Sequence, residues 1–251
     1  MLKKLPIAVA FTLAGPAFGG IPLVTDDTGT QGAGGNQIEV PLTREKAEDG
    51  SRAREIALVY TRGITDTVDV FVEKGRQKNT GADGVSVSGY GNTVIGAKWR
   101  AWESERKTSF AAKVAVALPV SQEKETEGFG TGKTSYEGLL ILSQEMEWGS
   151  VHANLGAGRA KFRDPAEDTD ATHFSVLPIL NVTDQFKVAV DLGIDRETTG
   201  VVTTNSRYAE IGVMYAPTEN TDLGLGYIRT TDKDSKEVTK TVTGGFTWRF
   251  K

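Results

Sequence analysis

Apolar and polar residues alternate along most of the chain beyond residue 35, which is the pattern of β-strands that have one apolar face. Between residues 186 and 193, for example, the even positions carry Phe, Val, Val and Leu, whereas the odd positions carry Lys, Ala, Asp and Gly. This alternation predicts about twelve strands: Asn36–Thr43, Ala53–Thr61, Thr67–Lys74, Asn92–Trp102, Thr108–Val120, Tyr136–Met146, Trp148–Lys161, Thr172–Val182, Gln185–Ile194, Arg207–Ala216, Thr221–Thr230 and Glu237–Phe250.

The links between these strands sort into two classes that alternate along the chain. Short links are expected at residues 62–66, 103–107, 147–149, 183–184 and 217–220; longer polar links are expected at 44–52, 75–91, 121–135, 162–171, 195–206 and 231–236. Bacterial outer-membrane barrels have short periplasmic turns and longer outer loops. The pattern therefore predicts an all-β fold, a single antiparallel transmembrane barrel with both termini on the periplasmic side.

Three of the short links share a turn with Thr followed by an acidic or amide residue. These turns open the segments 63–72, 181–190 and 216–225, and each leads into an apolar-alternating strand. Thr, Asp and Asn side chains bond nearby backbone groups in tight turns. Their common position supports the assignment of these links to one side of the membrane.

The last predicted strand ends with Gly245, Trp248 and Phe250 in a Gly-x-x-aromatic-x-aromatic pattern, followed by Lys251. Aromatic rings of this kind favour the bilayer interface. The pattern resembles the C-terminal signal that the barrel-insertion machinery reads, so that machinery and outer-membrane lipid are expected partners.

The first residues have the features of a signal peptide. Lys3 and Lys4 precede the apolar stretch Leu5–Leu13, and small residues follow it. The stretch is too short to cross a hydrocarbon core of about 30 Å. We expect cleavage after Ala17, so that residues 1–17 are a signal peptide, 18–35 a periplasmic or plug-like leader, and 36–251 the barrel.

Composition narrows the class of protein further. Hydrophobic residues make up 38% of the 251 residues, which argues against a bundle of membrane helices. The chain has no cysteine, which excludes disulfides and thiolate metal sites. Its net charge of −4 argues against a nucleic-acid partner, which would require a basic surface.

The segment Ile21–Gly34, together with Gln37 and Glu39, resembles the opening of proteins in the family described as "putative meta-pathway of phenol degradation". The recurring Thr-Asp turns resemble that family too. The resemblance implies an outer-membrane channel or transporter. It implies no cofactor and brings no catalytic residues.

If the apolar face of each strand meets lipid, the opposite face lines the lumen. This parity predicts eight pore-lining residues of both charge signs. Five further charged residues are placed inward with them: Arg159, Lys161, Glu39, Glu55 and Glu210. The charges either line a polar pore or pair across a filled lumen and hold the barrel shut. The eight candidates are Lys98, Arg100, Lys113, Lys187, Asp191, Arg249, Asp69 and Glu73.

One pair of residues has an enzyme-like arrangement. His173 and Ser175 are two positions apart, so they share a strand face and the imidazole could activate the hydroxyl. The pair resembles the His-x-Ser arrangement of outer-membrane phospholipases. No third group that would orient the histidine is evident from the sequence.

Together these features predict a non-enzymatic channel in the cell outer membrane. Its function would be the passive uptake of small solutes, hydrophobic or aromatic ones among them. The alternatives are an outer-membrane lipid hydrolase that uses His173 and Ser175, and a closed structural or adhesive barrel that acts through its outer loops.

Overall fold

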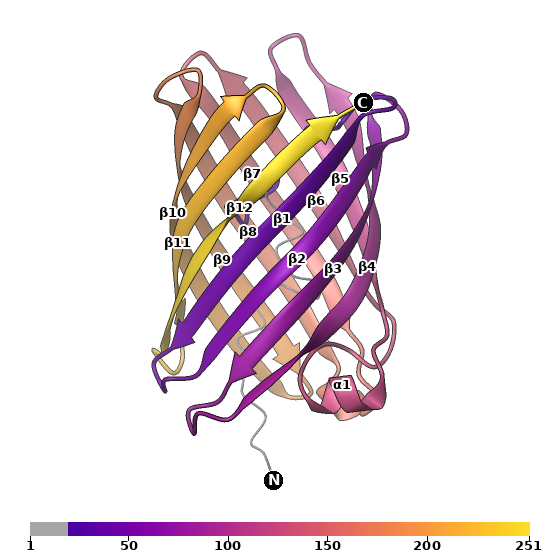
Figure 1. Ribbon diagram of the computed structural model, residues 1–251, viewed down its shortest axis with the longest axis vertical. Coiled ribbons are helices and arrows are strands. Elements are labelled where there is room, and N and C mark those ends of the chain that lie inside the picture. The colour runs from indigo at the N-terminus through magenta and orange to yellow at the C-terminus, as the bar shows by residue number, and fades with distance from the viewer. Residues whose placement is uncertain (1–19) are drawn as a thin grey trace.

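The computed structural model describes residues 20–251, in which twelve strands form one closed antiparallel barrel (Figure 1). The predicted signal peptide, 1–17, lies outside the described residues. A short helix, α1 (Gln122–Thr126), and a 3-10 turn, η1 (Pro165–Glu167), lie in the links. The strands are β1 (Asn36–Ala47), β2 (Arg52–Gly63), β3 (Val68–Thr80), β4 (Ser86–Glu103), β5 (Thr108–Leu118), β6 (Ser135–Met146), β7 (Gly149–Ala160), β8 (Thr169–Asn181), β9 (Phe186–Thr199), β10 (Val202–Thr218), β11 (Thr221–Asp232) and β12 (Val238–Phe250).

Each strand pairs with its neighbours in the chain, and β12 returns to pair with β1. At this seam Asn36 lies opposite Phe250, and the register runs without a break to Ala47 opposite Thr239. Closure leaves no strand edge with unpaired backbone groups, which is the condition for a sheet to cross a membrane. The predicted fold, a single antiparallel barrel of about twelve strands, is confirmed.

Alternation of side chains gives the barrel an apolar outer wall and a more polar interior. Large apolar residues are exposed on the outward face of every strand, as with Leu58, Val190 and Leu225, whose exposed fractions are 54%, 42% and 58%. Apolar exposure on this scale around a whole molecule fits contact with lipid. None of the helices within residues 20–251 is long and apolar enough to cross a membrane.

Nine of the twelve strands are longer than predicted, and most of the difference lies at one end of the barrel. β3 continues to Thr80 and β4 begins at Ser86. β9 and β10 are joined only through Gly200 and Val201. Three of the six predicted long links, 44–52, 75–91 and 195–206, are therefore mostly paired strand. The prediction ended these strands where the apolar alternation stops. The strands continue beyond that point because antiparallel pairing satisfies the backbone N–H and C=O groups of polar residues as well.

Two of the links at this end remain long, residues 119–134 and 161–168. We call this end of the barrel the long-loop end and the other the short-turn end. The loop 119–134 packs back onto the wall through Phe129, which is buried against Gly89 of β4. Glu125 of this loop bonds Arg163 of the other at 2.6 Å and joins the two.

Candidate functional site

Residues 20–35, which we call the leader segment, lie inside the barrel. Their hydrogen bonds reach the inward side chains of strands from β3 round to β9. Only a segment within the lumen can touch so many strands of a closed barrel. The leader segment then continues directly into β1 at Asn36.

Thr25 is the deepest polar anchor of the leader segment. Its backbone N–H donates to Asp191 Oδ2 at 2.7 Å, and its hydroxyl lies 2.7 Å from both Asp191 Oδ1 and Ser175 Oγ. The Tyr208 hydroxyl donates to the same carboxylate at 3.0 Å. Asp191 has no exposed surface, so these bonds compensate for the burial of its charge.

Asp26 provides the charged anchor next to it. Its carboxylate lies 2.9 Å from Lys113 Nζ and 3.3 Å from Lys98 Nζ, on neighbouring strands β5 and β4. Asn154 of β7 brackets the backbone of Asp26: its Oδ1 accepts from the Asp26 N–H at 2.7 Å, and its Nδ2 donates to the Asp26 carbonyl at 2.9 Å. Buried ions require this kind of full pairing.

The rest of the leader segment follows the wall to the short-turn end. Thr28 bonds the hydroxyls of Ser143 and Ser109, and the Gln31 N–H donates to Asp69. Gly63 lets the chain pass closely, because a Cβ there would collide with the carbonyl oxygen of Gly32. The leader segment therefore lies in a track that complements it.

An apolar contact completes the docking. Leu23 is buried in a cluster with Leu177 and Ala189, and Ile179 and Met214 pack against it. The interior of the barrel is thus polar along one part of the track and apolar along another.

The lumen opens toward the short-turn end as a vestibule of about 990 Å³. The leader segment forms part of its lining, through Asp26, Asp27 and Gln31 among others. Lys187, Arg249 and Lys98 of the wall also face it. A charged, water-accessible chamber therefore ends on the leader segment.

All eight predicted pore-lining residues lie on the inward face of the barrel. Six of them line the vestibule, whereas Asp191 lies beneath Thr25, and Glu73 is buried in the wall. That they line the path of a permeant stays a prediction. The six are Asp69, Lys98, Arg100, Lys113, Lys187 and Arg249.

Arg159 is placed differently from the prediction. It lies opposite Tyr136 and Asp170, on the outward face, because inward positions of β7 are the even-numbered ones such as His152 and Asn154. Lys161 follows the end of β7.

Neither of the two predicted arrangements of charge describes the lumen fully. Arg249 pairs with Asp222 at 2.6 Å on the wall, but Lys98 and Lys113 pair with Asp26 of the leader segment. Sequence reasoning missed Asp26 as their partner. The Thr-Asp-Asp run was visible, but the leader has no periodicity that would fix where its side chains lie.

Three inward carboxylates are held with little hydrogen bonding. One oxygen each of Glu73 and Glu210, and both of Glu137, have no hydrogen-bond partner among residues 20–251. Glu137 follows the inward parity of β6, which is the signal that could have identified it. No cluster of three or more His, Asp or Glu residues in this part of the chain is arranged to hold a metal ion.

The predicted His173–Ser175 pair does come together, and it has a third member. His173 Nε2 lies 2.9 Å from Ser175 Oγ, and His173 Nδ1 lies 2.7 Å from Asp195 Oδ1. This is the connectivity of a Ser-His-Asp triad. Ser175 has no exposed surface, it faces the lumen rather than lipid, and Thr25 bonds its hydroxyl.

Solved structures with a similar fold are outer-membrane barrels. An outer membrane channel from Pseudomonas putida F1 aligns with a TM-score of 0.67 at 13% identity, over 89% of this chain and 98% of that one. The NanC porin aligns with a TM-score of 0.59 at 8% identity, over 84% and 98%. The β domain of the Bordetella autotransporter BrkA aligns with a TM-score of 0.54 at 11% identity, over 87% and 100%. Identities this low show the fold alone.

A search among curated proteins finds no match to this sequence. The sequence profile of one family matches residues 20–250, which include the leader segment and all twelve strands. The chain therefore belongs to the family described as "Putative MetA-pathway of phenol degradation".

Proposed function

We propose that this protein is a passive channel of the cell outer membrane, with the leader segment as a plug in its lumen. The observation that carries the proposal is the vestibule of about 990 Å³, which opens at the short-turn end and ends on the leader segment. Its charged lining would admit water and small solutes. Displacement of the leader segment would extend the passage toward the long-loop end.

The names of similar proteins support this proposal. The Pseudomonas putida F1 structure is described as an outer membrane channel and NanC as a porin, and the family name refers to phenol degradation. Inward apolar groups near the charged residues, such as Phe71, Val59 and Val94, would provide contacts for a hydrophobic or aromatic permeant.

We further propose that the long-loop end faces outward and that both termini are periplasmic. The longer loops at one end and the aromatic C-terminal strand at the other support this orientation. In this arrangement residues 1–17 are a cleaved signal peptide, and the C-terminal strand of the mature barrel engages the insertion machinery.

Conductance of the purified full-length barrel in planar lipid bilayers tests the proposed function. We expect discrete current steps, and liposome swelling with small sugars or phenol as the permeant. Absence of both, for the intact barrel and for a variant lacking residues 20–35, would contradict the channel and favour a closed structural or adhesive barrel.

The triad geometry is the specific observation that keeps a hydrolase as a second candidate. We propose that the chain is not an enzyme and that Ser175, His173 and Asp195 serve to hold Thr25. In a lipid or short-chain ester hydrolysis assay, we expect no activity in the intact barrel, and therefore none lost in Ser175→Ala. Hydrolysis that disappears in Ser175→Ala would establish the enzyme instead.

A further inference from the structure

The outer wall of the barrel carries a band of exposed cations at the long-loop end, on strands that are neighbours in the closed sheet. These cations project outward, on the same face as the apolar residues that meet lipid. We call this set the basic belt. Its members are Lys240 of β12, Arg44 and Lys46 of β1, Arg52 and Arg54 of β2, and Lys78 of β3.

The register places like charges directly opposite one another across the strands. Lys46 lies opposite both Lys240 and Arg52. Arg54 lies opposite both Arg44 and Lys78. Like charges in this arrangement repel, so two rows of cations destabilise the bare sheet unless an external anion neutralises them.

Nothing within residues 20–251 neutralises the belt, because none of its members forms an ion pair there. Glu45 and Glu55 are adjacent to belt residues along the chain, but strand parity directs them inward. In the turns, Asp49 and Asp83 accept hydrogen bonds from the backbone N–H groups of Ser51 and Val85. Arg159 is a contrast on the opposite wall: it is an outward cation that has Asp168 and Asp170 as partners at 3.6 and 3.7 Å.

The belt borders the apolar wall at one level. On β2 the outward residues change from Arg54 to Ile56 and Leu58, and on β12 they change from Lys240 to Val242. The boundary between cations and apolar residues is where lipid headgroups meet a barrel. The expected counter-ions are therefore anionic groups at headgroup depth.

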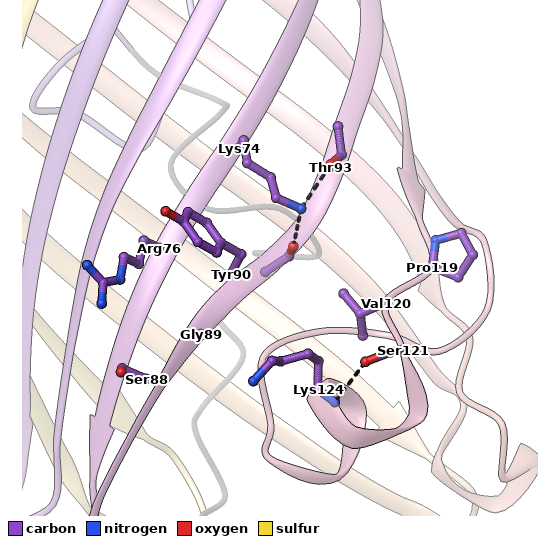
Figure 2. A pocket seen from close by; sticks show the side chains of 11 residues that line it. Lys74, Arg76, Ser88, Gly89, Tyr90, Thr93, Pro119, Val120, Ser121 and Lys124 are labelled. Atoms are coloured by element: carbon purple, nitrogen blue, oxygen red, sulfur yellow. Dashed lines mark hydrogen bonds between the residues drawn. The ribbon is translucent and has the colours of Figure 1, made fainter.

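A groove of about 600 Å³ extends the belt on β3 and β4 (Figure 2). Arg76, Lys124 and Lys74 line it beside the ring of Tyr90, and Lys74 Nζ donates to Gly91 O and Thr93 Oγ1. Cations around a concave surface, next to an aromatic ring and an apolar wall, fit a phosphate that is attached to acyl chains.

We propose that the basic belt and its groove bind a membrane lipid that carries more than one phosphate on its headgroup, such as bisphosphorylated lipid A. Two rows of cations complement a headgroup with several phosphates better than they complement a headgroup with a single phosphate. The acyl chains would lie along the apolar wall, on the side of the belt that is toward the short-turn end. This site goes beyond the channel function and depends only on the barrel lying in a membrane.

Native mass spectrometry of the full-length barrel, refolded in neutral detergent, tests the proposal with bisphosphorylated lipid A as the probe. We expect stable one-to-one binding that rising ionic strength weakens. The triple variant Arg44→Gln, Arg54→Gln, Lys78→Gln should lose about tenfold or more in affinity. Arg159→Gln, which removes a cation that already has partners, should bind as the unchanged barrel does.

Probes of different chemistry distinguish the sources of phosphate. Dephosphorylated lipid A and phosphatidylglycerol should bind at least about tenfold more weakly, and inorganic phosphate should not compete. Equal binding of phosphatidylglycerol, or equal losses in the triple variant and in Arg159→Gln, would overturn the proposal. Heat-dependent gel mobility checks folding, and Arg44→Lys with Arg54→Lys should keep binding. This experiment measures lipid binding and not conductance, so a negative result would overturn the lipid site without bearing on the proposed channel function.

Discussion

At the scale of single residues, the interior of the barrel is organised around two side chains of the leader segment. Asp26 neutralises Lys98 and Lys113, and Thr25 satisfies Asp191. Without the leader segment each of these wall residues would lose its shortest charge-stabilising contact, which is costly in free energy inside the barrel. The wall and the leader segment thus stabilise each other.

Asp26→Asn tests this mutual stabilisation. The substitution removes the carboxylate that lies nearest to Lys98 and Lys113, and hydrogen bonds to charged groups contribute about 1.5–3 kcal/mol. We expect the leader segment to undock more often, with an open probability in planar bilayers about tenfold or more higher than that of the unchanged barrel. Asp27→Asn is the control, because the Asp27 side chain is half-exposed and lies 3.9 Å from Lys98. An equal effect of both variants would contradict the role of Asp26.

Strand parity predicted the inward position of all eight pore-lining candidates, although Arg159 was assigned to the wrong face. Lys98, Lys113 and Asp191 follow directly from it, because side chains alternate without exception along a regular strand. Their partners could not be predicted, because Thr25 and Asp26 belong to a segment without periodicity. Asp195 was missed for a related reason. It lies opposite His173 on the adjacent strand, and the register between two strands cannot be read from a single sequence.

At the scale of elements, the strands were predicted in number and order but not in length. The hydrophobic pattern marks where a strand meets lipid, and the strands continue as polar hairpins beyond that level. The loop 119–134 is the main irregular element. It is attached through Phe129 and through the ion pair of Glu125 with Arg163.

The attachment of this loop should depend on pH in a defined direction. Burial raises the pKa of the Glu125 carboxyl, but hydrogen bonds and the charge of Arg163 outweigh burial, so the pKa lies below the usual 4.5. A lowered carboxyl pKa stabilises the docked loop above that value, and the stabilisation is lost as pH falls through the lowered pKa.

We therefore expect hydrogen exchange in residues 119–134 to show equal protection from neutral pH down to about 5, and loss of protection only at pH values below the usual carboxyl pKa of 4.5. Glu125→Gln should reduce the protection at neutral pH and remove its dependence on pH in the acid range, because it removes the charge that Arg163 binds. The neighbouring Glu123→Gln is the control. Loss of protection between pH 7 and 5 in the unchanged barrel would contradict this account.

At the scale of the whole molecule, the barrel has two different ends. The short-turn end contains the vestibule and the C-terminal aromatic residues, and the long-loop end has the basic belt and the joined loops. The sequence predicted this difference correctly in kind. The predicted size of the difference was too large, because three of the six predicted long loops are mostly strand.

The absence of cysteine from the chain allows a direct test of orientation. A cysteine in the loop 233–237, as in Ser235→Cys, should react with a membrane-impermeant maleimide on intact cells. Asp184→Cys, in a turn at the short-turn end, should react only after the outer membrane is permeabilised. The reverse result would place the termini on the outside.

The position of the leader segment has a consequence for how the protein is made. The segment immediately precedes β1, and β1 forms the final seam with β12. Once that seam has closed, a chain of this length could reach the same track only by threading through the mouth of the finished cylinder. Assembly is therefore simplest if the segment already lies on the inner side while the sheet is still open and curling. The β1–β12 seam would then close around a leader segment that is already in place.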